Sequence, residues 1–278
     1  MFTLSLLLSV LQLISCDNFN THSSTTGVST AKVVDSATIK RDSILRQDSL
    51  IALKKLKYDS TTRFIYMTFD DGPLAPTPFL NQIILEKQIQ MDAFVVGKHA
   101  FSNPQFMKHL DALKANSLIE VVNHSYSHAN GRYKNFYSAP QTAAEDMLGN
   151  QTKLGLTKKI IRMPGRDIWA LDNKSFGLRE NGGKTAAILH DNGYKVYGWD
   201  VEWEHSGKTA APKKSPQAML AIIDTLFANG SMLTKNHLVF LGHDEMLGSE
   251  KARNDLRTMI DSLKSRGYIF QHISDYPD

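Results

Sequence analysis

The chain has 278 residues, of which 42% are hydrophobic and 22% charged, so it is long enough for one large globular domain. Its net charge of +4 is spread over scattered basic residues, whose longest run is Lys54-Lys55-Leu56-Lys57, and this does not predict a nucleic-acid partner. The single cysteine, Cys16, excludes an internal disulfide and a zinc site built on several thiolates.

Residues 1–16 resemble the signal peptide of a bacterial lipoprotein. Residues 4–14 form an apolar run that is too short to span a bilayer as a helix, which takes about 20 residues, but suits the core of a signal peptide. Leu13-Ile14-Ser15-Cys16 resembles a lipobox, in which a small residue precedes the lipidated cysteine. We therefore expect an exported cell-envelope protein, held on a membrane by a lipid on Cys16 and facing the periplasm or the cell surface. An ordinary cleaved signal peptide is the alternative.

Residues 17–58 have the composition of a tether. Asn18–Thr30 is rich in Ser, Thr and Asn, and no long apolar periodicity follows before Ile51. Such a segment buries too little apolar surface to offset the entropy lost on ordering, so we predict that it is mostly disordered. The folded domain should then span residues 59–278.

From about residue 61, strand patterns and helix patterns alternate. Strands are predicted at Phe64–Phe69, Ala93–Val96, Leu118–Asn123, Lys159–Arg162, Tyr194–Trp199, His237–Leu241 and Tyr268–Gln271. Helices are predicted at Pro78–Gln88, from Asn103, from Pro140 to near Gly155, at Lys184–Asn192, from Ser215 to Gly230 and from Ser249 to Gly267. This alternation without consecutive hairpins predicts an α/β fold, a distorted (β/α)7-type barrel. A doubly wound open sheet is the alternative, but no glycine-rich phosphate loop follows the first strand.

Chemically reactive side chains follow five of the predicted strands. In chain order they are Asp70 and Asp71, then His124 and His128, then Arg162, then Asp200, then His243. The carboxyl ends of the strands share one rim in a barrel of this kind, and catalytic groups collect there. These residues, distant in sequence, should therefore meet in one site.

The spacing of His124 and His128 favours a metal site. Four residues apart, the two imidazoles would lie on one side of a single helical turn. Together with one carboxylate they would form a three-ligand site with open positions, which is the catalytic rather than the structural arrangement for zinc. The pair Asp70-Asp71 can supply that carboxylate, with the other aspartate free to accept a proton. Without a metal, the same pair would be an Asp-Gly turn that caps a helix.

Together these segments resemble the polysaccharide deacetylase family, which is carbohydrate esterase family 4 or the NodB-homology domain. The first family motif, Thr-Phe-Asp-Asp-Gly-Pro, is present at Thr68–Pro73. The second, His-Ser/Thr-x-x-His, is present at His124–His128, and the third, Arg-x-Pro, at Arg162–Pro164. The fifth, Leu-x-His, is present at Leu241–His243, and the resemblance runs from about residue 61 to residue 276.

The resemblance implies a metal-dependent hydrolase that removes acetyl groups, N-acetyl more than O-acetyl, from a polysaccharide or cell-wall glycan. Asp70 would be the general base, held by Arg162, and His243 would be the general acid. A divalent ion, Zn²⁺ before Co²⁺, Ni²⁺ or Mn²⁺, would be bound by Asp71, His124 and His128. Two other functions stay open: a carbohydrate-binding relative without turnover, and an amidohydrolase that acts on a small amide.

Two departures from the family pattern affect the expected site. Gly165 follows the third motif where an aromatic residue is common, so one wall of the substrate groove should be more open. The fourth motif, usually Asp-x-x-Asp-Trp, is only approximated by Asp200-Val201-Glu202-Trp203. Asp200 is favoured over Glu202 as the acidic residue that supports His243. Trp199 or Trp203 would line the sugar groove, with a core role as the alternative for Trp199.

Overall fold

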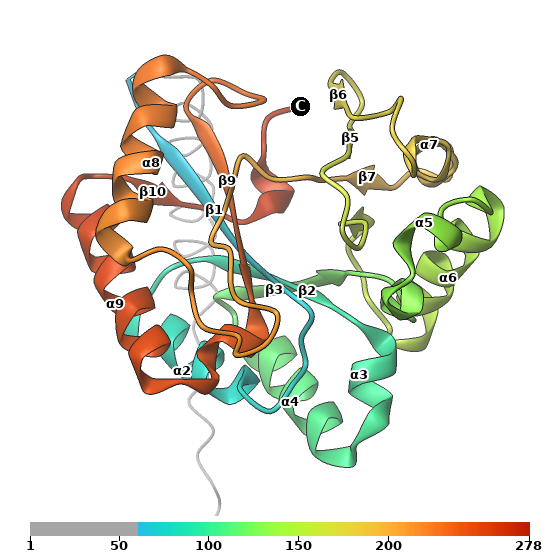
Figure 1. The fold of residues 1–278 in the computed structure, drawn as a ribbon, viewed down its shortest axis with the longest axis horizontal. Coiled ribbons are helices and arrows are strands. Elements are labelled where there is room, and N and C mark those ends of the chain that lie inside the picture. Colours follow the sequence, from blue (N-terminus) through green and yellow to red (C-terminus); the bar gives the residue numbers. More distant parts are fainter. Residues whose placement is uncertain (1–60) are drawn as a thin grey trace, which may run out of the picture. The chain divides into compact units, whose positions relative to one another are not determined.

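A fully buried strand, β1 (Phe64–Asp70), lies in the middle of the sheet in the computed structural model, which describes residues 61–278 (Figure 1). The predicted signal peptide at residues 1–16 and the predicted tether at residues 17–58 lie outside the described residues. The strands follow the order β6-β5-β7-β4-β3-β2-β1-β9-β8, and β10 pairs with the start of β1. Every pairing is parallel except those that β5 makes with β6 and β7.

The remaining elements alternate along the chain much as predicted. The other strands are β2 (Met91–Val95), β3 (Ile119–Asn123), β4 (Ile160–Ile161), β5 (Trp169–Ala170), β6 (Ser175–Phe176), β7 (Lys195–Val196), β8 (Val201–Glu202), β9 (His237–His243) and β10 (Ile269–Phe270). The α-helices are α2 (Thr77–Lys87), α3 (Gly97–Ser102), α4 (Pro104–Ala115), α5 (Tyr133–Phe136), α6 (Pro140–Lys153), α7 (Gly183–Asp191), α8 (Pro216–Asn229) and α9 (Glu250–Ser265). Three 3₁₀ turns complete the described part: η1 (His128–Gly131), η2 (Asp244–Gly248) and η3 (Ile273–Asp275).

The helix boundaries follow from capping residues that the sequence displays. The side chains of Asn103, Ser215 and Ser249 accept hydrogen bonds from backbone N–H groups in the first turns of α4, α8 and α9. Gly230 ends α8 with a φ of 65°, a left-handed conformation that glycine adopts without a steric penalty. No helix among residues 61–278 combines the length and the apolar character needed to cross a membrane.

Alternate residues of β1 point to opposite faces of the sheet, and this positions the site. Ile65, Met67 and Phe69 belong to the larger hydrophobic core, together with residues of α2, α8 and α9. Phe64 and Tyr66 face the other way, into a core inside the curled sheet that includes Phe94, Trp169 and Tyr197. Thr68 and Asp70 continue that inner row, so the interior changes from apolar to polar towards the carboxyl end of β1.

The sheet forms a curled half-barrel, which confirms the predicted α/β barrel type, but one local prediction was wrong and two elements were not predicted. The predicted strand Tyr194–Trp199 is β7 only at residues 195–196, and the chain then crosses to the opposite edge of the sheet. Tyr197 donates its N–H to Ile161 of β4, whereas Asp200, just before β8, donates to Val239 of β9. A short hairpin, β5–β6, and helix α3 were not predicted, because two-residue strands and a single helical turn carry no periodicity.

Candidate active site

A cleft of about 620 Å³ opens at the carboxyl ends of β1, β3 and β9. Five residues predicted from the sequence line it: Asp70, Asp71, His124, His128 and His243. Ten further residues complete the lining: His99, Tyr133, Gly165, Trp199, Glu202, Glu204, His205, Lys213, Leu241 and Glu245. Asp70 and His243 are register partners on neighbouring parallel strands, so the predicted base and the predicted acid lie side by side at the rim.

Asp70 is held by a fully buried arginine. Arg162, the residue after β4, donates from Nη1 to Asp70 Oδ1 at 2.9 Å and to Thr68 Oγ1 at 2.7 Å, and from Nη2 to the Gly198 carbonyl at 2.9 Å. The guanidinium also lies 4.2 Å from the centroid of the Phe94 ring, a cation–π distance. A buried guanidinium needs such partners, and one of them, Asp70, is thereby fixed in one orientation.

Asp71 adopts an unusual backbone conformation directly after β1. Its φ of 75° lies in the left-handed region that non-glycine residues rarely occupy, and such strain concentrates at functional sites. The following turn is anchored by buried Asp244, whose carboxylate accepts hydrogen bonds from the Leu74 N–H at 3.1 Å and from the Thr77 hydroxyl. As a result Asp71 turns towards the cleft rather than into the opposite face of the sheet.

Three potential metal ligands converge there. Asp71 Oδ1 lies 3.4 Å from His124 Nε2 and 3.0 Å from His128 Nε2. His124 Nδ1 lies 2.9 Å from the Arg162 carbonyl and can donate to it, which leaves the lone pair of Nε2 directed at Asp71. One carboxylate oxygen and two imidazole nitrogens form a donor set that suits a zinc-type ion.

Charge within this cluster agrees with a cation-binding role. Although burial opposes ionisation, hydrogen bonds from His124 and His128 hold the pKa of the Asp71 carboxyl well below its usual range. Burial also opposes a charge on His124, but the neighbouring carboxylates of Asp70 and Asp71 raise the pKa of its imidazole above the ordinary value. The protein therefore places a carboxylate and two imidazoles together in a pocket that favours positive charge.

The two histidines do not lie on one helical turn, as their spacing predicted. His124 follows β3, and η1 begins only at His128; between them Ser125 has a φ of 75°, and His128 itself has a φ of 50°. The buried Asn123 side chain accepts the Ser125 N–H at 2.9 Å, and the Ser125 hydroxyl accepts the His128 N–H at 3.0 Å. A tight turn built on these side chains brings the imidazoles together, with ring centroids 5.2 Å apart.

Asp200 lies beneath the cleft and does not line it. One carboxylate oxygen accepts the Leu233 N–H at 2.9 Å and the other accepts the Val239 N–H at 2.7 Å. Burial raises the pKa of Asp200 to about 6. Among residues 61–278, no carboxylate lies within ion-pair distance of His243, so the predicted support of His243 by Asp200 stays a prediction.

The aromatic lining agrees with the expectation for one tryptophan and differs from the expectation at Gly165. Trp199 lines the cleft, whereas Trp203 is fully buried and donates from its indole to the Lys214 carbonyl at 3.0 Å. The Tyr133 ring lies 3.3 Å from where a side chain at Gly165 would begin, so Tyr133 occupies part of the space that was expected to be open. It also packs edge-on against His128, with ring centroids 5.7 Å apart.

Several lining residues escaped the sequence analysis. His99 in α3 contacts the Asp71 carbonyl through Nδ1 at 2.6 Å, and it comes four residues after the end of β2. His205 comes three residues after β8, and Glu245 two residues after β9. The positions of His205 and Glu245 close to strand ends could have indicated that they line the site, but neither residue belongs to a recognisable spacing pattern.

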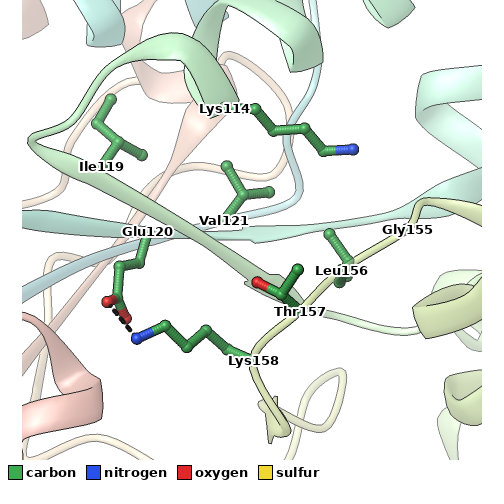
Figure 2. A pocket seen from close by; sticks show the side chains of 8 residues that line it. All are labelled: Lys114, Ile119, Glu120, Val121, Gly155, Leu156, Thr157 and Lys158. Carbon is green, nitrogen blue, oxygen red and sulfur yellow. Dashed lines mark ion pairs between the residues drawn. The ribbon is translucent and has the colours of Figure 1, made fainter.

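A second group of metal-ligand residue types lies at the other end of the sheet. Asp92, Glu120 and His272 come together near the amino-terminal ends of β2 and β3, but each has a protein partner. Asp92 lies 3.3 Å from His272, and Glu120 lies 2.7 Å from Lys158. Figure 2 shows this Glu120–Lys158 ion pair beside a hollow of about 320 Å³ at the start of β3. We interpret the group as a network of ion pairs, and the acid–base residues lie in the cleft at the opposite ends of the strands.

Comparison with known proteins agrees with the motifs over part of the chain. Residues 57–170 match the polysaccharide deacetylase family, which is the family that the motifs predicted. The matched segment contains the first three motifs and ends before His243.

Solved structures extend the likeness in fold over most of the chain. A CE4 esterase from Streptococcus mutans superposes with a TM-score of 0.57 at 20% identity, covering 80% of this chain and 89% of that one. The catalytic domain of a peptidoglycan N-acetylglucosamine deacetylase from Eubacterium rectale gives 0.56 at 22% identity, covering 77% and 90%. The peptidoglycan deacetylase PdaC from Bacillus subtilis gives 0.53 at 19% identity, covering 78% and 90%. At these identities the likeness establishes the fold.

Proposed function

We propose that this domain is a polysaccharide deacetylase that hydrolyses N-acetyl groups on a cell-envelope glycan. The observation that carries the proposal is the grouping of Asp71, His124 and His128 beside Asp70 and His243 in one cleft. Two of the similar structures are peptidoglycan deacetylases, which supports an N-acetylated glycan as the substrate class.

The side chains divide into an ion site and an acid–base pair. Asp71, His124 and His128 would hold a divalent ion, with Zn²⁺ favoured by the nitrogen-rich donor set. Bound there, the ion would polarise the acetyl carbonyl and acidify a water molecule. Asp70 accepts the proton of the attacking water through the oxygen that Arg162 does not hold. His243, beside Asp70 on β9, donates a proton to the leaving amine nitrogen.

The cleft is open enough for a polymer. Its lining is mainly polar, and Trp199 and Tyr133 provide aromatic surface of the kind that packs against sugar rings. Both candidate histidine ligands line the cleft, with His124 buried and His128 partly exposed. A glycan chain could therefore lie along the cleft and present an acetyl group to the ion site.

The test is acetate release by the purified, zinc-loaded protein from peptidoglycan, a chitooligosaccharide, acetylxylan and a small acetylated amide. Release from peptidoglycan or the chitooligosaccharide is expected. Release from acetylxylan alone would assign O-acetyl esters, and release from the small amide alone would assign an amidohydrolase. Absence of release from every substrate, with metal bound, would contradict hydrolysis and favour a binding relative.

We also propose that the domain is anchored to a bacterial membrane through a lipid on Cys16. Leu13-Ile14-Ser15-Cys16 and the preceding apolar run support this, because they resemble a lipoprotein signal. Wild-type protein should partition into detergent, and Cys16→Ser should release or mislocalise it. Soluble wild-type protein, cleaved at another position, would contradict the anchor.

A further inference from the structure

The immediate surroundings of His243 are unusual for a general acid. A catalytic histidine is commonly oriented by a carboxylate, but both Asp200 oxygens are taken by backbone N–H groups. What packs against His243 is another imidazole. The His205 and His243 rings are perpendicular, at 88°, with centroids 4.9 Å apart.

His205 is itself held in place. Its Nε2 lies 3.1 Å from Glu245 Oε1. His205 comes from the loop after β8, which is closed by an antiparallel bridge between His205 and Pro212, and Glu245 comes from η2 directly after His243. Two separate segments thus meet around the His243 ring, and both His205 and Glu245 line the cleft.

We propose that His205, held by Glu245, is a positioning residue for His243. This inference rests on the proposed function, in which His243 protonates the leaving group. The perpendicular contact restricts the His243 ring to one orientation, which is the role that a carboxylate partner usually performs. Unlike a carboxylate, His205 brings no negative charge, so it does not stabilise a charged His243.

The charged groups around the two imidazoles affect the protonation of His205. Glu245 in η2, Glu202 in β8 and Asp71 after β1 all favour a positive His205. Burial, followed by the facing His243, opposes them and lowers the pKa of His205 below its ordinary value. Glu204 and Lys213 also line the cleft, but they form an ion pair with each other at 2.9 Å. The neutral form of His205 is therefore favoured, so His205 can hold the His243 ring without adding a charge beside it.

The experiment compares kcat, KM and the pH dependence of kcat/KM for the zinc-loaded protein on a chitooligosaccharide. His205→Asn removes the ring, and we expect kcat to fall about tenfold with KM little changed. The position of the basic limb of kcat/KM should not change, because the lowered pKa of His205 favours its neutral form and the substitution removes no charge beside His243. His205→Phe restores a ring that can pack against His243, so kcat should recover.

A matched control is available. Another histidine–carboxylate pair, His190–Asp172 at 3.4 Å, does not line the cleft. His190→Asn removes this pair and should leave both kcat and the pH profile unchanged. If His205→Asn raises KM alone, or if His205→Phe recovers no more kcat than His205→Asn, the proposal is wrong.

A second readout separates this proposal from the proposed function. Imidazole ¹⁵N resonances can be compared by NMR in the wild type, His205→Asn and His205→Phe, without any substrate. A His243 resonance that broadens in His205→Asn and recovers in His205→Phe supports the positioning, and a resonance that is the same in all three proteins overturns it. Failure of the wild type to release acetate would overturn the proposed function, while the NMR comparison still decides the positioning.

Discussion

Arg162 and Asp70 form a buried ion pair in which one guanidinium nitrogen, Nη1, lies 2.9 Å from Oδ1. The other carboxylate oxygen, Oδ2, lies 3.5 Å from His124 Nε2 and so faces the ion site. Arg162 also contacts the candidate ion site through its backbone, because its carbonyl oxygen lies 2.9 Å from His124 Nδ1. One arginine therefore orients both the candidate base and a candidate metal ligand.

The two neighbouring aspartates should separate into a ligand and a base. Asp71→Asn should weaken zinc binding and abolish acetate release together, because its Oδ1 faces both imidazoles. Asp70→Asn should abolish acetate release with zinc still bound, since the amide nearly preserves shape but cannot take up the proton. Calorimetric zinc titration of the metal-free variants, run beside acetate release, measures both effects.

The outcome can contradict this assignment in two ways. Loss of zinc by Asp70→Asn, with zinc retained by Asp71→Asn, would reverse the two roles. Full activity of both variants would remove the basis for the proposed hydrolysis. An exposed aspartate offers the control: Asp261→Asn should alter neither zinc binding nor acetate release, because Asp261 pairs with Lys87 on the helical surface and does not line the cleft.

Replacement of Arg162 should affect stability as well as rate. Arg162→Ala leaves a buried carboxylate without its partner, which typically costs about 3–5 kcal/mol of unfolding free energy. Arg162→Lys keeps the charge but cannot reproduce the planar set of donors to Asp70, Thr68 and Gly198, so its loss should be smaller. Urea unfolding and acetate release measure the two effects. Equal stability of wild type and Arg162→Ala would show that the ion pair is not required for folding.

Much of the fold could be predicted because its long elements carry strong local signals. The apolar run of β1 and the Asn-Pro and Ser-Pro starts of α4 and α8 depend only on neighbouring residues. The crossing between β7 and β8 could not be predicted in the same way. Tyr197 hydrogen-bonds to β4 and Asp200 hydrogen-bonds to β9, and these two partners are distant in sequence.

The candidate site likewise contains residues that the sequence predicted and contacts that it did not. Asp70, Asp71, His124, His128 and His243 follow strand ends within short motifs, so the sequence predicted that they would meet. The contact of His205 with His243 depends on how two loops pack, and the Tyr133 ring beside Gly165 depends on where α5 lies. No spacing of residues along the chain predicts either contact, so both could be found only from the three-dimensional structure.

His243→Asn should remove the general acid without disturbing the ion site. We expect kcat/KM to fall by roughly 10²–10⁴-fold and the basic limb of its pH profile to disappear. Zinc affinity should stay at the wild-type level, since the three converging ligand atoms belong to other residues. Rate measurements from pH 5 to pH 10 and a zinc titration test this. A variant as active as the wild type would mean that another group protonates the leaving amine.

Asp244 should make the stability of the domain depend on pH. The carboxyl is fully buried, and burial raises its pKa to about 7, against the hydrogen bonds from Thr77 and Leu74. The unfolded chain loses this proton near the ordinary value of 3.8, whereas the folded protein keeps it up to about pH 7. The folded state therefore binds more protons between these values, and the stabilisation is fully present below about pH 4 and lost as pH rises through about 7.

Unfolding free energies of the metal-free protein in urea, measured with a chelator present, should consequently fall between pH 5 and pH 8. The full pKa difference corresponds to at most about 4 kcal/mol. Asp244→Asn removes the titrating group, so the fall should become smaller. Some dependence should remain, because burial also raises the pKa values of Asp92 and Asp200 to about 6. Asp261→Asn, on the surface, should keep the wild-type slope. An unchanged slope in Asp244→Asn would show that Asp244 is already ionised in the folded protein at pH 5.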